Sequence, residues 1–377
     1  MWNHRSLAHI DFRTIPILLL LMLISLLVIS STTLGGLDPS ESPFFTPMAA
    51  AQLRWFAIGW IFYLFFAGMD YKYLREWTWV IYTGMLFLLV GLFFTSAVQN
   101  VHRWYKIPGT GFAFQPSEYA KLAVVLALSW FIEQKGRAIS SIPSAIAALA
   151  IVFVPFVLIL KQPDLGTALV LFPITLVIFY LGGVNTRVVR LMKMGGIAAF
   201  GFVFLIFSGV LSHETMKPIV TRVIKEYQYE RLNPETYHQS ASQAAIALGG
   251  WTGSGWRKSS FTGRRWLPAA STDSVFAAFA EEFGLIGVFF ILSLFFALIY
   301  FSFQVTALAK DEFGRLLSAG ITVYLAMHVI VNIGMMCGFL PITGVPLTLI
   351  TYGGSSVLST MIALGILQSI YSRRFMF

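Results

Sequence analysis

The sequence of 377 residues has few charges and almost no cysteine. Asp, Glu, Lys and Arg make up 11% of the chain, less than half of the share of about 25% in typical globular proteins. So few charges cannot cover a water-soluble surface, and disordered chains, which are polar, are excluded too. The single cysteine, Cys337, excludes an intrachain disulfide and a cysteine-rich metal site.

Apolar residues dominate the composition instead. They make up 57% of the chain, with 35 Phe, and the mean hydropathy is +0.76. Apolar runs of this length are helical in a membrane, because a helix satisfies its own backbone hydrogen bonds. The sequence therefore predicts an all-α polytopic membrane protein of about ten spans, near residues 15–33, 53–69, 77–96, 117–132, 142–160, 165–182, 194–211, 275–302, 317–338 and 353–371.

The distribution of Lys and Arg predicts the orientation of these spans. With the N-terminus inside, the inner segments carry 13 Lys or Arg and the short outer loops carry three, Arg103, Lys106 and Lys161. Positive residues favour the cytoplasmic side, so both termini are expected there. The net charge of +9 is spread between the spans and indicates membrane topology rather than nucleic-acid binding. The first run is too long for a signal peptide and is expected to be a retained helix.

A long outer loop of residues 212–274 separates the seventh and eighth spans. Long loops are largely exempt from the positive-inside rule. An anionic partner or substrate would explain why this one is basic. Its eight Lys and Arg residues are Lys217, Arg222, Lys225, Arg231, Arg257, Lys258, Arg264 and Arg265.

Polar residues at the ends of the spans are the candidates for function, because burying a charge in a bilayer costs at least about 2.5–3.5 kcal/mol. The first motif is Gln115-Pro116-Ser117-Glu118-Tyr119-Ala120-Lys121. Lys121 shares a helix face with Glu118, which indicates either an internal ion pair or a cation, oriented by Glu118, for an anionic group. Upstream, Arg103 and Trp104 suit either a phosphate or an interfacial anchor.

Two further motifs carry carboxylates. The second is Gln162-Pro163-Asp164-Leu165-Gly166-Thr167, where Asp164 can simply cap the next helix. The third begins with Thr272 and Asp273, where the long loop re-enters the membrane, and Glu281 follows about two helical turns later. Asp273 is either an N-cap or a group in an outer cavity, and there it could act as a general base or hold a divalent cation.

The last outer loop, residues 340–356, is rich in Pro and Gly and contains Tyr352. It breaks the helix at membrane depth, where irregular backbone is tolerated only if protein or water surrounds it. We expect a re-entrant loop that lines the same outer cavity. The glycine-rich run of residues 249–255 lacks the ending of a nucleotide-binding loop, and the six His show no metal-site spacing.

Taken in order, these segments resemble the SEDS family of bacterial cell-wall polymerases. The resemblance covers essentially the whole chain as a single membrane domain, residues 1–377. The length and the wording of residues 344–347 are most similar to elongation-type members. The matching motifs are Arg103-Trp104, Gln115 to Glu118 with Lys121, Gln162 to Thr167, Thr272-Asp273 with Glu281-Glu282-x-Gly284, and Gly344-Val345-Pro346-Leu347 with Tyr352-Gly353-Gly354-Ser355.

The resemblance implies a glycosyltransferase that polymerises lipid II into glycan strands at the outer face of the bacterial cytoplasmic membrane. Asp273 matches the essential aspartate of the family, and Arg103 and Lys121 would offset the charge of the pyrophosphate. It further implies a divalent cation (Mg or Mn) as a candidate cofactor, a class B penicillin-binding protein as partner, contacts with membrane lipids, and no nucleic acid. The other expected substrate-binding residues are Trp104, Gln115, Glu118, Asp164, Thr272, Glu281 and Tyr352.

The chain departs from the family pattern beside Asp273. The usual Pro-Glu-x-His-Thr-Asp-Phe is here Pro268-Ala269-Ala270-Ser271-Thr272-Asp273-Ser274. Thr351 replaces a Ser, and the loop after Tyr227-Gln228 is shorter. This departure keeps open the alternative of a non-catalytic scaffold for a transpeptidase, and a lipid-linked precursor flippase with the same outer cavity is a second alternative. A requirement for Asp273 in glycan synthesis would distinguish the enzyme from the scaffold.

Overall fold

The computed structural model describes residue 2 and residues 4–34, 43, 45–95, 103–106, 113–221, 229–230 and 232–374. Arg222, Lys225, Arg231 and the Tyr227-Gln228 pair lie outside the described residues. The elements in chain order are η1 (His4–His9), α1 (Thr14–Thr32), α2 (Pro47–Gly68), α3 (Lys72–Glu76), α4 (Thr78–Gly91), η2 (Leu92–Phe94), β1 (Tyr105–Lys106), β2 (Ala113–Phe114), α5 (Pro116–Lys135), η3 (Gly136–Ser140), α6 (Ile142–Lys161), α7 (Leu165–Leu181), α8 (Thr186–Phe207), α9 (His213–Val220), α11 (Tyr237–Gly249), α12 (Val275–Leu308), α13 (Glu312–Met336) and α14 (Gly354–Ser372).

All ten predicted spans fall on helices, which confirms an all-α membrane protein. Seven helices are long and apolar enough to cross a membrane, namely α1, α2, α6, α8, α12, α13 and α14. Two shorter apolar helices, Thr78–Phe94 and Leu165–Leu181, also match predicted spans. The tenth is α5, which carries the charges of Glu118 and Lys121 in its first two turns.

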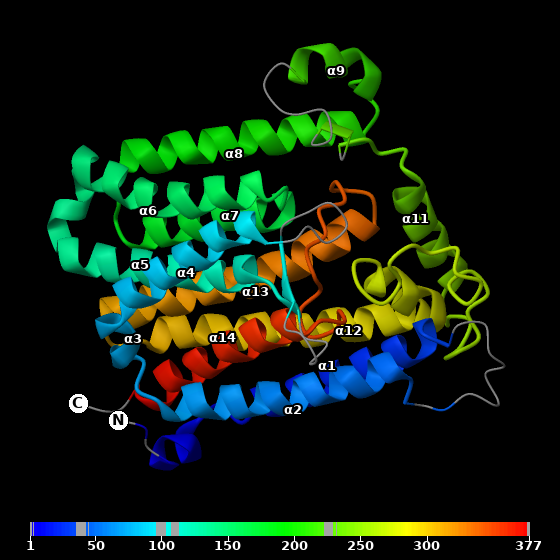
Figure 1. Ribbon diagram of the computed structural model, residues 1–377, viewed down its shortest axis with the longest axis horizontal. Coiled ribbons are helices and arrows are strands. Elements are labelled where there is room, and N and C mark those ends of the chain that lie inside the picture. Colours follow the sequence, from blue (N-terminus) through cyan, green and yellow to red (C-terminus); the bar gives the residue numbers. More distant parts are fainter. Residues whose placement is uncertain are drawn as a thin grey trace.

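The helices lie side by side, and the turns between them collect at two ends (Figure 1). One end carries α3, the α5–α6 and α7–α8 turns, and both termini, and the other carries α9 and α11. Every segment predicted to be cytoplasmic and described here lies at the first end. We call it the inner end and the opposite one the outer end, after the orientation that the Lys and Arg count predicts.

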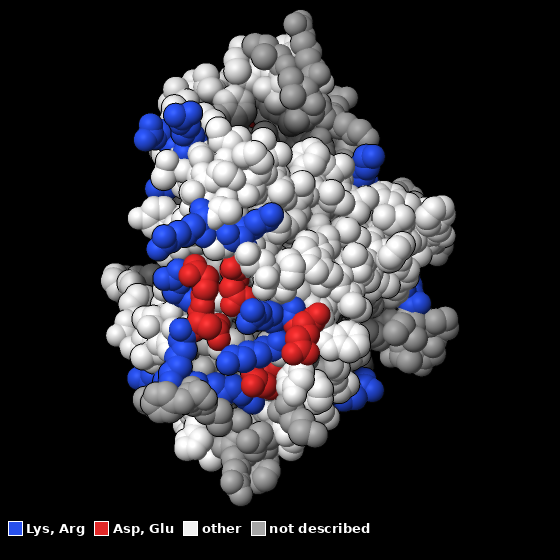
Figure 2. Space-filling view, turned by 90° about the vertical axis from the view of Figure 1, so that its left-hand side faces the viewer, with Lys and Arg blue, Asp and Glu red and all other residues white. Residues whose placement is uncertain are grey.

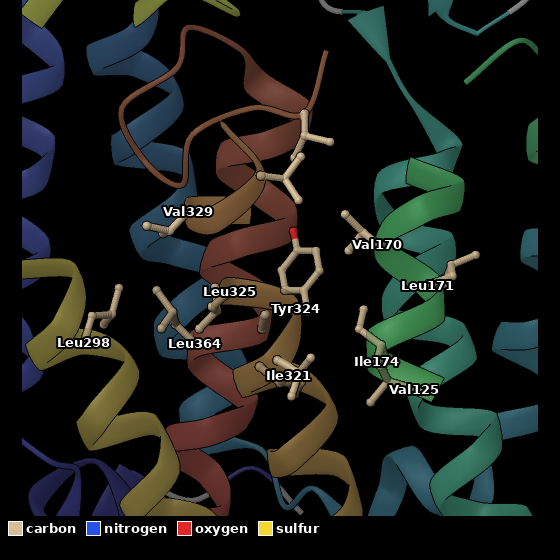
Figure 3. Packing of buried hydrophobic residues seen from close by; sticks show 14 of the residues in the cluster. Val125, Val170, Leu171, Ile174, Leu298, Ile321, Tyr324, Leu325, Val329 and Leu364 are labelled. Atoms are coloured by element: carbon tan, nitrogen blue, oxygen red, sulfur yellow. The ribbon is translucent and has the colours of Figure 1, made fainter. Parts of the chain in front are cut away.

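Helix α13 is the centre of the bundle. Of the span-length window in α13, 78% is buried inside the protein. Figure 3 shows Ile321 and Tyr324 of α13 facing Val125 of α5 and Ile174 of α7 across the core, with Leu364 of α14 on the opposite side, beside Leu325. A helix with no face toward solvent or lipid is expected to be apolar all round its surface.

Local sequence signals explain where several helices begin. Asp311 accepts the N–H of Gly314 at 2.6 Å and caps α13, and Thr46 caps α2 ahead of Pro47. Helix α8 begins eight residues before the predicted span, at Thr186 rather than 194. The prediction placed its start too late because Arg187 and Arg190 interrupt the apolar run, while the Asn185 side chain caps the helix before them.

Candidate functional site

A polar cavity of about 370 Å³ lies at the outer end. Its walls come from five segments: the residue pair before β1, residues 229–230 of the outer loop, the start of α11, the turn before α12, and the last outer loop. The lining residues are Arg103, Glu230, Thr236, His238, Asp273, Ile342, Thr343 and Gly344. The predicted re-entrant loop therefore does line the cavity that contains Asp273.

Asp273 is held in the cavity wall by α13 and by the last outer loop. The side-chain amide of Asn332 donates to the backbone carbonyls of Asp273 at 3.1 Å and Val345 at 2.8 Å. Gly344 has φ of +76°, and a Cβ there would lie in ordinary van der Waals contact with Oδ2 of Asp273, at 3.5 Å. Only glycine adopts that backbone conformation readily, so the positive φ, rather than lack of space, favours glycine beside the carboxylate.

His238 is a cavity residue that the sequence analysis missed. It lies in the first turn of α11, and its Nε2 is 2.6 Å from Oγ of Ser274, directly after Asp273. Burial lowers the pKa of the imidazole below its ordinary value, although the nearby charge of Asp273 opposes this shift. The imidazole is therefore neutral at pH 7. Nothing in the local sequence marks His238, because its position depends on how α11 packs.

Arg103 is fixed at the cavity by the turn between α6 and α7. Its guanidinium donates to the carbonyl of Gln162 at 3.0 Å and to the carbonyl of Pro163. This leaves a half-buried cation facing the same space as Asp273. Trp104 is also half-buried, but it is not among the residues that line the cavity.

The second motif ties two helix starts together. Asp164 accepts the N–H of Thr167 at 3.2 Å and caps α7, as the simpler interpretation proposed. The same carboxylate accepts the Ser117 hydroxyl at 2.9 Å and the Gln115 side-chain amide at 3.2 Å. Asp164 and Gln115 thus join α7 to α5 behind the turn that holds Arg103.

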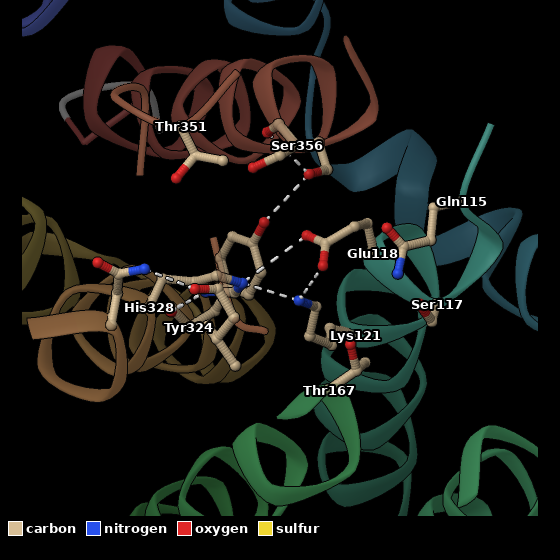
Figure 4. Close-up of polar contacts among 12 residues, drawn as sticks. Gln115, Ser117, Glu118, Lys121, Thr167, Tyr324, His328, Thr351 and Ser356 are labelled. Carbon is tan, nitrogen blue, oxygen red and sulfur yellow. Dashed lines mark hydrogen bonds and ion pairs between the residues drawn. The ribbon is translucent and has the colours of Figure 1, made fainter. Parts of the chain in front are cut away.

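Deeper in the bundle, Lys121 lies between Glu118 and His328 (Figure 4). Its Nζ is 2.8 Å from Oε1 of Glu118 and 2.8 Å from Nε2 of His328. Both side chains of the Glu118–Lys121 pair are at most 2% exposed. The structure therefore shows the internal ion pair, extended by His328, and these residues do not line the outer cavity.

Glu281 supports the outer loop from behind. Its carboxylate accepts the backbone N–H groups of Phe261 at 2.8 Å and Thr262 at 2.9 Å, and it is buried away from the cavity. Hydrogen bonds from the last outer loop also hold the backbone just before Asp273. The Thr351 hydroxyl donates to the carbonyl of Thr272 at 3.2 Å, and the N–H of Tyr352 donates to Ser271 at 3.0 Å.

The described residues contain no group of three or more His, Cys, Asp or Glu side chains that could hold a metal ion. Within the cavity, Asp273 and Glu230 are the carboxylates. A cation bound there would need oxygen atoms from a substrate to complete its coordination. This donor set fits a cation that arrives with a phosphate group, and it does not fit a permanently bound structural metal.

Fold and cavity together define a polytopic membrane protein that presents a carboxylate and a guanidinium at one membrane face. The sequence model of the family described as "Cell cycle protein", of the FtsW/RodA/SpoVE type, matches residues 12–374. The chain belongs to this family.

Two relatives match along nearly their whole length. The peptidoglycan glycosyltransferase MrdB of Escherichia coli K12 is 32% identical over 374 residues, which cover 97% of this chain and 95% of that protein. Stage V sporulation protein E of Bacillus subtilis is 32% identical over 378 residues, with coverage of 96% and 98%.

Solved structures share the fold. The crystal structure of RodA from Thermus thermophilus is similar with a TM-score of 0.70 and 23% identity, covering 98% of both chains. A chain of a peptidoglycan synthase complex, described as coordinating polymerization and crosslinking, is similar with a TM-score of 0.74 and 23% identity over 98% of this chain and 99% of that one.

Proposed function

We propose that this chain is a peptidoglycan glycosyltransferase that polymerises lipid II in the outer cavity. The observation that carries the proposal is the cavity itself, where Asp273 and Arg103 meet from segments some 170 residues apart in the chain. Relatives of almost equal length are named peptidoglycan glycosyltransferases.

The two side chains suit the two halves of the reaction. In the proposed step the 4-hydroxyl of the acceptor sugar attacks the anomeric carbon of the donor, and the bond from that carbon to the pyrophosphate oxygen breaks. The Asp273 carboxylate takes the hydroxyl proton as general base. Undecaprenyl pyrophosphate leaves with the bonding electrons, and the positive charge of Arg103 offsets the charge that develops on it.

In the alternative role proposed for Asp273, its carboxylate would hold a divalent cation, Mg²⁺ or Mn²⁺, instead of accepting the proton. When bound, the cation would supply further positive charge to the leaving pyrophosphate. The residues that position Asp273 act whether or not a cation binds, because Asn332 holds the backbone rather than the carboxylate.

We further propose that the enzyme works in the bacterial cytoplasmic membrane with a single-span class B penicillin-binding protein, for glycan synthesis during elongation and cell-shape maintenance. Support comes from a solved structural neighbour that belongs to a complex for polymerization and crosslinking. The other expected substrate contacts, from Trp104, Gln115, Thr272 and Tyr352, stay predictions. The buried residues Glu118, Lys121, Asp164 and Glu281 are proposed to act through the cavity walls that they hold.

Incubation of the purified protein with lipid II, its transpeptidase partner and Mg²⁺ tests the activity. Glycan strands longer than the disaccharide unit are expected from the wild type. If no strands form while the complex with the partner remains intact, the result contradicts the enzyme hypothesis and favours the scaffold hypothesis. If lipid II instead moves between the leaflets of sealed vesicles without polymerising, the result favours the flippase hypothesis.

A further inference from the structure

Ion pairs between arginines and carboxylates occur at the inner end of the protein. Four of its arginines are paired with carboxylates, and Figure 2 shows the acidic side chains of this face gathered among basic ones. The pairs are Arg13–Asp11 at 2.7 Å, Arg75–Glu133 at 3.0 Å, Arg315–Glu312 at 2.8 Å and Arg373–Asp70 at 3.8 Å.

Three exposed cations on α8, Arg187, Arg190 and Lys193, differ from these four arginines, and two of them, Arg190 and Lys193, line one cavity. Arg190 and Lys193 are three residues apart and lie on one face of the helix, and both are exposed. Within the described part of the chain, no salt bridge includes either of them. Their charge is therefore available to a ligand, whereas the charges of the four paired arginines are already offset by carboxylates.

Arg190 and Lys193 line a concave site rather than an open surface. The cavity between the end of α7 and the start of α8 has a volume of about 290 Å³. Tyr180 and the backbone turn at Gly183 form its opposite wall. Nζ of Lys193 lies 4.7 Å from the centroid of the Tyr180 ring, which holds the ammonium group against the wall by a cation–π contact.

The same face of α8 becomes apolar above the cavity. Ile197 and Phe204 follow Lys193 by four and eleven residues, so all three share one side of the helix. Ile197 is 74% exposed and Phe204 is 55% exposed. Only 11% of the span-length window in α8 is buried inside the protein, so this face is open to the acyl chains of the bilayer.

We propose that the cavity binds the phosphate headgroup of an anionic glycerophospholipid in the inner leaflet. The two cations neutralise the phosphate, the Tyr180 ring packs against the glycerol region, and the acyl chains lie along Ile197 and Phe204. Basic pockets between membrane helices are suited to such headgroups. Interfacial anchoring alone would require neither a concave site nor two cations without carboxylate partners. The inference is independent of the glycosyltransferase reaction.

The test measures binding of short-chain phosphatidylglycerol to the purified full-length protein by native mass spectrometry, with phosphatidylcholine of the same chains as reference. The wild type is expected to prefer phosphatidylglycerol. The double variant Arg190→Gln/Lys193→Gln should bind it about 30-fold more weakly, from about fivefold per cation. The matched variant Lys135→Gln/Arg137→Gln removes two exposed cations at the same end, outside the cavity, and should bind as the wild type does.

Equal binding of the two lipids by the wild type, or an equal loss in both double variants, would overturn the proposal. Competition by millimolar inorganic phosphate as strong as that by the lipid would overturn it too, because the site would then recognise a free anion. An unchanged melting temperature of both variants in phosphatidylcholine shows that a loss of binding is not a loss of folding.

Discussion

Asp273, in the turn just before α12, and His238, in α11, face one cavity, and each depends on its surroundings. The backbone of Asp273 is held by Asn332 at 3.1 Å. His238 contacts the next residue, Ser274, at 2.6 Å. A neutral imidazole can accept the Ser274 hydroxyl proton as a hydrogen bond, whereas an imidazolium cannot. The protonation state of His238 therefore affects Ser274, the N-cap of α12, which directly follows Asp273.

This predicts a pH dependence of stability. Because burial lowers the pKa of His238, the unfolded chain, with a histidine pKa of about 6.5, binds this proton more tightly than the folded protein. The contribution of His238 to stability is present above that pH and is lost as the pH falls through the lowered folded value. Asp273, Glu230 and Arg103 face the same cavity and are present in both proteins compared below.

The measurement is the melting temperature of the purified wild type and of His238→Gln at about pH 7.5 and about pH 5.5. Acidification should lower the melting temperature of the wild type more than that of the variant. An equal decrease in both would show that His238 does not carry the effect.

At the residue scale, the sequence analysis identified the cavity residues that lie in recognisable local motifs. Arg103 and Asp273 were predicted and do line the cavity. His238 was missed because only the packing of α11 brings it beside Asp273. For Lys121 both alternatives began from the same i, i+3 spacing, and His328, more than 200 residues away, completes the internal pair that the structure shows.

At the scale of helices, the Glu118–Lys121–His328 cluster joins α5 to α13. Lys121→Met would leave the Glu118 carboxylate buried without its cation, and removal of one partner of a buried pair costs about 3–5 kcal/mol. The double variant Glu118→Gln/Lys121→Met removes the charge as well, so it should recover part of that loss. Unfolding of each purified variant in detergent measures the difference, and a double variant no more stable than Lys121→Met would contradict this account.

Helix α12 is interrupted for a definite reason. Gly284 has φ of +63° and ψ of −167° within the helix. The break frees the carbonyls of Glu281 and Glu282 to accept the N–H groups of Ser254 at 2.9 Å and Gly255 at 3.0 Å. The outer loop is thereby attached to α12 by backbone hydrogen bonds just below Asp273.

Replacement of Gly284 should therefore weaken the whole outer loop. In Gly284→Ala the new Cβ would lie 2.3 Å from the backbone nitrogen of Gly253, and strained backbone conformations of this kind cost about 1–3 kcal/mol before the clash is counted. Gly195→Ala in α8, where a Cβ meets nothing within 4 Å, is the matched control and should not destabilise. Limited proteolysis of the outer loop should increase only in the first variant.

Element positions were predictable where hydropathy alone decides them. The ten apolar runs all proved helical, since a bilayer permits little else. The helices of the outer loop, α9 and α11, and the β1–β2 hairpin were not predicted. Their segments are polar or short, and they are stabilised by contacts such as Oγ of Ser355 with the carbonyl of Ala113 at 2.9 Å, which no local pattern reveals.

For the whole molecule, the Lys and Arg distribution predicts that the inner end faces the cytoplasm. In a Cys337→Ser background, Ser140→Cys at the inner end should react with a membrane-impermeant maleimide only from the cytoplasmic side. Ser260→Cys in the outer loop should react only from the outside. Labelling of intact spheroplasts and of inverted vesicles measures both, and the reverse pattern would exclude lipid II polymerisation at the outer face.

The central claim is that glycan bonds form at Asp273. The most direct measurement is the rate of lipid II polymerisation by purified complexes that contain wild-type protein, Asp273→Asn or Asp164→Asn. Asp164 is a matched carboxylate that caps α7 outside the cavity. Loss of a positioned general base is expected to slow polymerisation by about 10²–10⁴-fold in Asp273→Asn, with a much smaller effect in Asp164→Asn at equal amounts of folded protein. Polymerisation by Asp273→Asn at the wild-type rate would contradict the claim.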